Sequence, residues 1–466
     1  MVKQYYVSKY ENALFLFFLI FLVWLPIPLG SNRLWATAIM EIGAFLLFLW
    51  LIVLIERGII VIPQHVRKLK WLLVLMIFSL LYALFQLVEL PMDIFKTISP
   101  IHADINNEAL ILEQVDGLSI SVDHYKTYSY ILKLLAYYAI FWISIILANT
   151  NKRVFYLLLA IALGGTVQAV FSIAGALGDW YTSINTGSKV FSGIISGSFV
   201  NYNHFAAFLN MSIVALIGLI FLTRMEISPR HLQARARAKT PLWQIHFSIY
   251  FAVLIAAMIM THSRGGAIAL LLAFAGSFLL IASNSVYRVR YLSAFNGLWV
   301  IAFLVVLWAG YGFFIAQFDN ASNDYSIRLH ILHLSWQVIK DFWLLGVGAG
   351  NYAALIPLYE TSSFGFYIDH AHNDYIELLV EQGVIGFLIY FIMILIAMVY
   401  SIKTIRHIDS VSYKTYALIG LMGCMTMLFH SLIDFNFQIP SNAAYFFIFL
   451  ALALLRPAHY GLNWKI

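Results

Sequence analysis

The sequence has little charge and almost no capacity for disulfide bonds. Charged residues make up 11% of the 466 positions and hydrophobic residues 62%. A soluble globular domain is about a quarter charged and about half apolar, so this composition excludes a soluble globule and makes the bilayer the solvent for most of the chain. The one cysteine, Cys424, lies in an apolar run without a disulfide partner, and we expect it to be a packing residue.

No soluble domain, low-complexity tract or repeat of fixed period is recognisable. The chain instead carries apolar runs of the length that a helix needs to cross a membrane, about 20 residues. These runs are too long for the strands of a barrel, so we predict an all-α, polytopic integral membrane protein, a single transmembrane domain over residues 1–466. The expected spans, about twelve by the length rule, are residues 14–30, 34–55, 71–90, 128–148, 154–177, 205–223, 243–261, 266–283, 297–316, 384–402, 415–432 and 442–455.

Lysine and arginine are concentrated in alternate connections between the spans. Basic connections are typical of the cytoplasmic side, so we expect them and both termini to lie inside, with the first apolar run retained as an anchor and not removed as a signal peptide. The run 224–239 is more simply a topology signal than a patch for anionic lipid or nucleic acid. The basic connections are residues 57–70, 152–153, 224–239, 288–290 and 403–414.

The longest outward connection, residues 317–383, forms a large loop between the ninth and tenth expected spans. Apolar residues at helical spacing from Ile327 to Phe342 predict a helix resting on the membrane surface or on the bundle. A glycine-rich run, Gly346 to Asn351, ends it, and it lacks the strand and the lysine that a nucleotide-binding loop needs. We expect a second helix to begin near His372 and to run unbroken into the span at residue 384.

Three arginines stand where the topology disfavours positive charge, and two of them, Arg264 and Arg328, need an explanation. Only Arg33, Arg264 and Arg328 fall outside the cytoplasmic connections and chain ends. Arg264 lies in a tight hairpin at the membrane surface, where a charge is costly and suggests function; an unmatched arginine reaching toward water is the alternative. Arg328 lies on the loop helix, where a salt bridge to Asp319 or Asp324 is an equally simple account.

Histidines and carboxylates cluster at the end of the large loop, from Asp369 through His370 and His372 to Asp374, followed by Glu377 and Glu381. A metal site is one interpretation, but a third ligand with clear spacing is not evident. General-base catalysis is the interpretation that we favour, because a histidine can take a proton from an attacking hydroxyl at neutral pH. Helix capping explains Asp369 and Asn373 equally well.

Other polar residues lie at the outer ends of the expected spans. The sixth span starts with Asn201, Tyr202, Asn203 and His204, and Gln86, Glu89, Gln168, His430 and Asp434 occupy similar positions. Apart from Glu41, the central thirds of the spans hold almost no ionisable group. A transporter needs such groups along its path, so we expect the active centre at the outer leaflet.

Three segments together resemble the bacterial O-antigen ligases and O-antigen polymerases and the related protein O-oligosaccharyltransferases, with a fold of the GT-C type. The similarity covers about residues 190–435. It is carried by Phe199-Val200-Asn201-Tyr202-Asn203-His204, by Ser263-Arg264-Gly265-Gly266, and by Arg328 with Gly346-Val347-Gly348-Ala349-Gly350-Asn351, His370-Ala371-His372-Asn373-Asp374-Tyr375 and Glu381-Gln382-Gly383.

The resemblance implies a metal-independent, inverting glycosyltransferase at the periplasmic face of the bacterial inner membrane. Its donor would be an undecaprenyl-diphosphate-linked glycan, with no cofactor and no nucleic acid involved. Carried over by position, Arg264 and Arg328 would hold the diphosphate and His372 would accept the proton of the acceptor hydroxyl. Substrate-binding or positioning roles would fall to Asn201, Asn203, His204, Asp374 and Glu381.

Several alternatives stay open at this point. An O-antigen ligase transfers the glycan to lipid A core and is the preferred interpretation, whereas a polymerase uses another glycan chain as acceptor. Members that modify proteins carry an added C-terminal region, and this sequence shows none after the last expected span. A polysaccharide transporter, and a scaffold whose polar residues only cap helices, are further alternatives.

Overall fold

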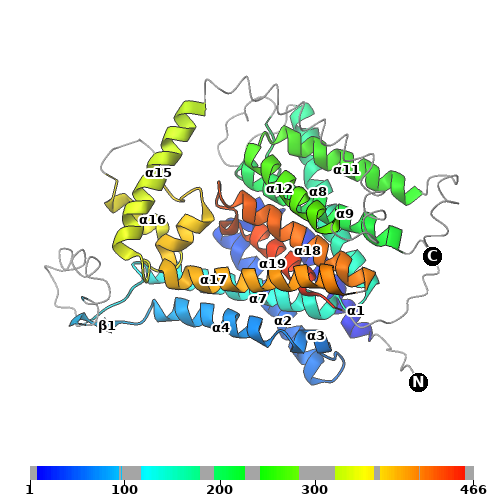
Figure 1. Cartoon of the computed structure of the whole chain (residues 1–466), viewed down its shortest axis with the longest axis horizontal. Coiled ribbons are helices and arrows are strands. Elements are labelled where there is room, and N and C mark those ends of the chain that lie inside the picture. The colour runs from blue at the N-terminus through cyan, green and yellow to red at the C-terminus, as the bar shows by residue number, and fades with distance from the viewer. Residues whose placement is uncertain are drawn as a thin grey trace.

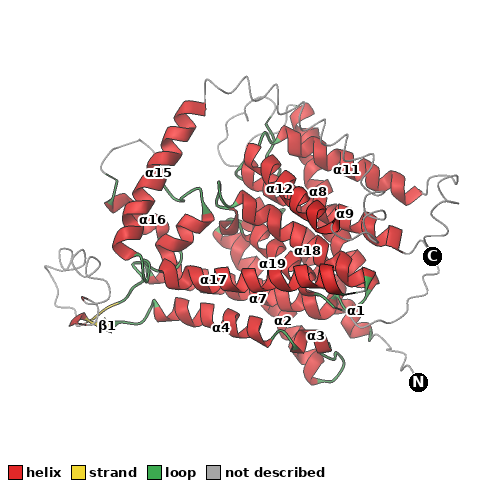
Figure 2. Ribbon diagram, viewed as in Figure 1, coloured by secondary structure: helices red, strands yellow, loops and turns green. Residues whose placement is uncertain are grey.

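The computed structural model describes residues 8–93, 96, 117–178, 194–225, 242–282, 321–360, 368–408 and 410–456. These residues form helices almost throughout, with one short antiparallel pair of strands, β1 (Leu90–Pro91) and β2 (Gly117–Leu118), as Figure 2 shows. The prediction of an all-helical polytopic protein is therefore confirmed in its main feature.

The predicted spans match the observed helices closely. Each predicted range except 297–316, which lies outside the described residues, overlaps a helix. The helices that correspond to predicted spans are α1 (Lys9–Trp24), α2 (Leu34–Glu56), α4 (Lys70–Phe85), α7 (His124–Leu147), α8 (Asn151–Leu177), α9 (Tyr202–Met225), α11 (Leu242–Met260), α12 (Arg264–Ala282), α17 (Asp374–His407), α18 (Val411–His430) and α19 (Pro440–Leu454).

Within the described residues, 6 helices are long and apolar enough to cross a membrane by themselves: α2, α7, α8, α9, α12 and α17. Three apolar helices are shorter, with described cores at Lys70–Phe85, His246–Met260 and Pro440–Leu454. The total of about twelve spans and the orientation of the chain stay predictions.

The centre of the bundle is α19. Every residue from Pro440 to Leu454 is buried, and a helix that is apolar all round belongs in the interior of a bundle. α18 and α7 pack on α19, and α12 packs on the other side of α18, so these four helices lie in the order α12, α18, α19, α7 (Figure 1). In contrast, α2 and α17 leave most of their apolar residues uncovered, as helices facing lipid do.

An outer layer covers one end of the bundle. It contains α15 (Ala321–Phe342), the short α16 (Tyr352–Leu355) and a one-turn 3-10 helix, Ile356–Leu358, and Figure 1 shows α15 and α16 beyond the ends of α4 and α17. α15 buries Ile331, Leu334, Val338 and Phe342 in a separate small core with Tyr352. The helix predicted from Ile327 to Phe342 is confirmed and starts earlier, at Ala321.

The prediction that the helix near His372 runs unbroken into the membrane is wrong. α17 begins at Asp374, but Gly383 has φ 60° and ψ −169°, which interrupts the helix. The N–H of Val384 turns away from its own helix and donates to the carbonyl of Trp343 at 2.8 Å. A side chain at residue 383 would place its Cβ 2.4 Å from the Leu344 carbonyl oxygen, so glycine is required there.

The glycine segment, Gly346–Asn351, fills this interruption. Val347 and Gly348 donate their N–H groups to the carbonyls of Val380 and Glu381, at 3.1 and 2.9 Å. The amide of Gln86, at the outer end of α4, donates to the carbonyl oxygens of Leu345 and Glu381 and accepts the N–H of Ala349. The segment therefore supplies the hydrogen bonds that the broken helix lacks, which is one recognised cause of a helix kink, and it fixes the outer layer to the bundle.

Candidate active site

The site is built around the outer hairpin loop, Ser431–Asn436, which connects α18 to the 3-10 turn before α19. The start of α17 is bound to this loop. Asn373 caps the helix by accepting the N–H groups of Tyr375 and Ile376 at 3.0 and 3.1 Å, as asparagine commonly does. Its side-chain amide also donates to the Leu432 carbonyl at 2.8 Å. This contact fixes the adjacent His372 beside the loop.

Asp374 strengthens the same connection. Its N–H donates to the Ser431 carbonyl at 3.0 Å, and its buried carboxylate accepts the N–H of Phe437 at 3.1 Å. Both groups of this residue are therefore used to join α17 to the segment between α18 and α19. Its predicted role in substrate binding has no direct support in this geometry.

Arg328 reaches the outer hairpin loop from α15, 105 residues earlier in the chain. One of its guanidinium nitrogens, Nη1, donates to the carbonyl of Ile433 at 2.7 Å. A guanidinium has five N–H donors in a planar fork, a geometry that suits phosphate oxygens. The large loop thus folds back over the bundle and brings Arg328 to the residue before Asp434.

Arg264 is the first residue of α12 and is exposed. The following residue, Gly265, lies directly against the outer hairpin loop: a Cβ at this position would be 2.4 Å from Ile433 Cδ1 and 3.2 Å from His430 Nε2. A side chain at residue 265 would therefore displace Ile433. The first turn of α12, which begins at Arg264, thus lies against the residue whose carbonyl Arg328 binds.

His372 and Asp434 form the polar centre of the loop. His372 Nδ1 and His204 Nε2 lie 3.7 and 3.5 Å from the same carboxylate oxygen, Asp434 Oδ1, which is ion-pair range but longer than a hydrogen bond. Burial of Asp434 opposes its charge, yet the two neighbouring imidazoles outweigh burial and hold the pKa of this carboxyl well below its ordinary value. Asp434 is therefore a buried carboxylate at neutral pH.

The orientation of His372 suits a base. Its Nδ1 is buried while 28% of the side chain is exposed, so the accessible part of the ring is the part that carries Nε2. The residue also has a positive φ of 49°, a conformation that is uncommon and strained outside glycine. Such strain persists where the surroundings fix it, here through the cap at Asn373 and the carboxylate of Asp434.

Three histidines surround the ring of Phe435. His370 stacks on it with centroids 4.0 Å apart, and His204 and His372 contact it edge-on at 4.5 and 5.0 Å. His370 also bonds Glu377 through Nδ1 at 2.8 Å. Burial lowers the pKa of His370, but the charge and hydrogen bond of Glu377 outweigh it and raise that pKa to about 9, so His370 is an imidazolium at neutral pH.

Among the described residues, buried polar atoms without hydrogen bonds are concentrated at this loop. Such atoms are rare in native proteins unless a ligand, an ion or water completes their hydrogen bonds. Here they include Nδ1 of His372 and His430, Nε2 of His204, Oδ2 of Asp434, Oγ of Ser431 and both amide atoms of Asn436. The loop is therefore prepared for a polar partner.

The remaining predicted site residues lie at different distances from this centre. His204 belongs to it through Asp434 and Phe435. Asn201 precedes α9 and accepts the N–H of Asn203 at 2.8 Å, a capping contact about one turn before His204. Glu381 is buried and accepts the N–H of Tyr352 at 3.2 Å, so it contributes to the attachment of the outer layer.

Sequence reasoning missed the residues that hold this centre together. Asp434 and His430 were visible as polar residues at the outer end of a span, but their spacing predicts no specific partner. Phe435 gave no signal, because one aromatic residue in an aromatic-rich chain is not distinctive. Among the described residues, no three His, Cys, Asp or Glu side chains are grouped as a metal would need.

Part of this site lies in a segment that is similar to a known family. The family model described as O-antigen ligase matches residues 249–391, a range that contains Arg264, Arg328, the glycine segment and His372. No curated protein matches the sequence. The resemblance drawn from the three motif segments is thereby confirmed, and residues 249–391 are similar to the O-antigen ligase family.

Proposed function

We propose that this protein is a membrane glycosyltransferase of the O-antigen ligase type. It transfers a glycan from an undecaprenyl-diphosphate carrier to lipid A core at the periplasmic face of the inner membrane. The observation that carries the proposal is the convergence on one loop: Arg328 bonds Ile433, Gly265 packs on Ile433, and His372 faces Asp434. Donor, acceptor and mechanism are inferred from this arrangement and from the family.

The two arginines bind the leaving group in this mechanism. A guanidinium presents paired donors that match phosphate oxygens and keeps its charge at any physiological pH. As the bond between the anomeric carbon and the diphosphate oxygen breaks, negative charge grows on that oxygen. Two guanidinium groups placed in advance stabilise this charge more in the transition state than in the substrate, which is the requirement for catalysis. A leaving group stabilised in this way needs neither a proton nor a metal.

His372 activates the acceptor. Its Nε2 takes the proton of the acceptor hydroxyl while the hydroxyl oxygen forms a bond to the anomeric carbon, on the face opposite the departing diphosphate. The glycosidic bond forms, undecaprenyl diphosphate leaves, and the configuration at the anomeric carbon is inverted. The proton ends on His372 and returns to water when the products leave.

Asp434 supports this step as a positioning residue. A carboxylate beside Nδ1 favours the tautomer with its proton on Nδ1, which leaves Nε2 free to accept a proton, and it stabilises the imidazolium that forms. His204 shares the same carboxylate oxygen, so it limits the positions that Asp434 can take. Phe435 packs against both rings and fixes their planes.

Reconstitution tests the proposal directly. The purified protein in liposomes is mixed with an undecaprenyl-diphosphate glycan and lipid A core, and products are separated by gel electrophoresis. We expect glycan to move to lipid A core, unaffected by a chelator, and the Arg264→Ala, Arg328→Ala and His372→Ala variants to form no product while still inserting into the membrane. Full activity of the His372 variant contradicts its role as the base.

The same assay separates the alternatives. A polymerase lengthens the lipid-linked glycan and leaves lipid A core unchanged, whereas a protein-glycosylating enzyme modifies only an added acceptor protein. A transporter moves the carrier lipid between leaflets and forms no glycosidic bond. Inhibition by a chelator that is reversed by one metal ion favours the metal interpretation of the His-Asp cluster.

A further inference from the structure

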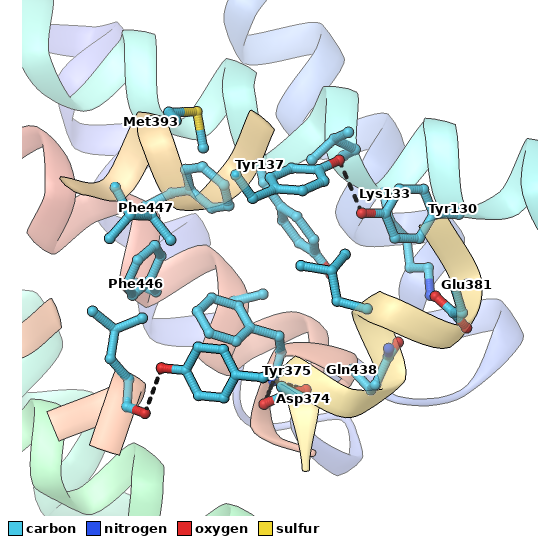
Figure 3. A pocket seen from close by; sticks show the side chains of 17 residues that line it. Tyr130, Lys133, Tyr137, Asp374, Tyr375, Glu381, Met393, Gln438, Phe446 and Phe447 are labelled. Atoms are coloured by element: carbon cyan, nitrogen blue, oxygen red, sulfur yellow. Dashed lines mark hydrogen bonds between the residues drawn. The ribbon is translucent and has the colours of Figure 1, made fainter. Parts of the chain in front are cut away.

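A second feature, separate from the arginines, lies inside the bundle beside α17. It is a cavity of about 130 Å³ between α7, α17, α18 and α19, shown in Figure 3. Its walls are mostly apolar and aromatic, including Leu134, Tyr137, Met393, Phe446 and Phe447. An apolar cavity of roughly this size takes up a molecule such as benzene, so it has room for a short segment of hydrocarbon chain.

One charged group makes this cavity unusual. Lys133 of α7 lines it, and in the part of the chain that the structure describes its ammonium group has no hydrogen-bond or ion-pair partner within direct contact. Glu381, Glu41 and Glu377 act on Lys133 through their charge, without direct contact. Figure 3 places Lys133 and Glu381 at the same end of the cavity, and one Glu381 oxygen already accepts the N–H of Tyr352.

A cation in these surroundings suits a ligand that is both anionic and apolar. Charge inside a membrane protein is costly unless it is paired, and an anion bound beside Lys133 would give it a partner in direct contact. The apolar walls favour a hydrocarbon chain attached to that anion. A phosphate carried on a hydrocarbon chain combines both properties, and the chain can be acyl or isoprenoid.

The position of the cavity indicates which substrate it serves. Asp374 and Tyr375 line it and follow His372 in the chain by two and three residues. Phe437 lines it from the segment after the outer hairpin loop. The arginines approach that loop from α12 and α15, whereas α7 lies beyond α18 and α19 from α12. The start of α12 at Arg264 and the cavity wall on α7 therefore lie on opposite sides of the α18–α19 pair.

We propose that this cavity holds the phosphate-bearing hydrocarbon anchor of the acceptor, with Lys133 paired to the phosphate. The inference rests on the proposed function, which assigns the arginines to the donor. In a transfer reaction the two substrates meet at the base from separate directions, so the side of His372 away from the arginines is the acceptor side. The acceptor is accordingly a lipid-borne molecule and not a free glycan or a soluble protein.

Lipid photolabelling tests the site without requiring turnover. The protein in nanodiscs is exposed to phosphatidylglycerol that carries a diazirine on its acyl chain, and labelled peptides are identified by mass spectrometry. We expect labelling of residues 130–137 and 443–447, reduced about tenfold by Lys133→Gln, since an ion pair in such a site changes affinity by about that factor. Excess undecaprenyl phosphate that displaces the probe identifies an isoprenoid anchor, and displacement only by acyl phospholipid identifies an acyl anchor.

A matched pair of substitutions on α7 tests the link to the acceptor. Leu134 lines the cavity and is 5% exposed, whereas Leu135 is 37% exposed and faces away. We expect Leu134→Trp to raise the KM for lipid-anchored acceptor about tenfold while the KM for donor stays constant, and Leu135→Trp to change neither. Lys133→Gln, which adds no bulk, gives the same pattern if Leu134→Trp does not fold.

The outcomes separate this inference from the proposed function. A wild-type protein that forms no glycosidic bond but is labelled in the cavity contradicts the proposed function and supports the lipid site. Labelling spread evenly over lipid-facing helices, unchanged by Lys133→Gln, overturns the lipid site. Labelling in the cavity with an unchanged KM for the acceptor in both variants overturns its assignment to the acceptor.

Discussion

Two polar regions at the outer end of the bundle, the glycine segment and the outer hairpin loop, differ in how their buried polar groups are paired. In the glycine segment, Asn351 donates to Ser121, Thr127 and Ala349 and accepts the N–H of Asp123. In the outer hairpin loop, by contrast, both amide atoms of Asn436 have no hydrogen-bond partner among the described residues. The same residue type is fully paired in one region and unpaired in the other.

This difference distinguishes buried polar residues that support the fold from buried polar residues that a ligand or water can complete. A fully paired buried network makes a structure rigid and unique, whereas an unpaired buried polar group is costly and persists where a ligand or water completes it. The glycine segment is itself a motif of the family, so membership of a motif does not by itself mark a residue as functional. We therefore expect substitutions in the loop to lower activity and substitutions around the glycine segment to lower stability.

The strongest test of this comparison is His372→Ala. Loss of the base should lower the rate of transfer about 10³-fold, with little change in melting temperature, because the side chain makes no hydrogen bond that supports the fold. Turnover and thermal unfolding are measured on the same purified protein. His333→Ala, an exposed histidine on α15, is the matched control and should keep full activity.

Arg328→Ala should have the next largest effect. Removing one positioned charge from the leaving diphosphate should reduce kcat by about 10² to 10³. Arg328→Lys should recover little of this, because an ammonium does not provide paired donors. Single-turnover rates and the KM for donor are measured for both. Equal activity of the lysine variant and the wild type would show that charge alone suffices.

Asp434→Asn should lower kcat by up to about a hundredfold through misplacement of His372. Because the substitution keeps size and leaves the arginines intact, the KM for the donor should stay constant. Steady-state kinetics with varied donor separate the two parameters. A rise in KM without a fall in kcat would place Asp434 in substrate binding and remove it from the orientation of the base.

Gln86→Leu should lower stability and leave activity nearly unchanged, unlike the three substitutions above. It leaves the carbonyls of Leu345 and Glu381 and the N–H of Ala349 with fewer partners, and each unpaired buried group costs about 1–3 kcal/mol. We expect a melting temperature lower by several degrees and a nearly normal rate for the protein that stays folded. A large loss of kcat at unchanged stability would break the distinction between the two regions.

The smallest expected effect is a dependence of stability on pH through His370. Its pKa is raised to about 9 in the folded protein, above the value of about 6.5 in an unfolded chain. The stabilisation that comes from its protonation is therefore full below about pH 6.5 and is lost as the pH rises through about 9. The gap in melting temperature between the wild type and His370→Gln should shrink over this range, and a gap that widens contradicts the ion pair with Glu377.

Much of the fold was predictable because the bilayer imposes simple rules. Apolar runs of membrane-spanning length located the bundle helices from α1 to α12 and from α17 to α19, and periodicity in the large loop located α15. The short helices α3 and α16 were not predicted, and the segment 297–316 lies outside the described residues. The unbroken helix was predicted wrongly at Gly383, because a single glycine in a helical pattern is usually tolerated. Only the contact with Leu344 and the glycine segment shows that the helix must open there.

The sequence predicted the charged residues of the site, but it did not predict the residues that surround and position them. Arg264 and Arg328 were recognisable because they break the charge bias of the connections, and His372 because of its neighbours in sequence. Lys133 gave no such signal, since it lies near the outer end of an otherwise ordinary span. Asp434 lies more than 60 residues from His372 and more than 200 residues from His204 in the chain. Spacing in one sequence carries no information about contacts between such distant residues.

The interruption at Gly383 has a mechanical consequence. Transmembrane helices tilt when the thickness of the bilayer changes, and a continuous helix would transmit that tilt to its outer end. Here the first turns of α17, which follow His372, are bonded to Gln86 and to the outer hairpin loop, while the membrane segment begins after the break. We expect His372 to keep its position when the protein moves between membranes of different thickness, because tilt of the membrane segment is not transmitted across the break at Gly383.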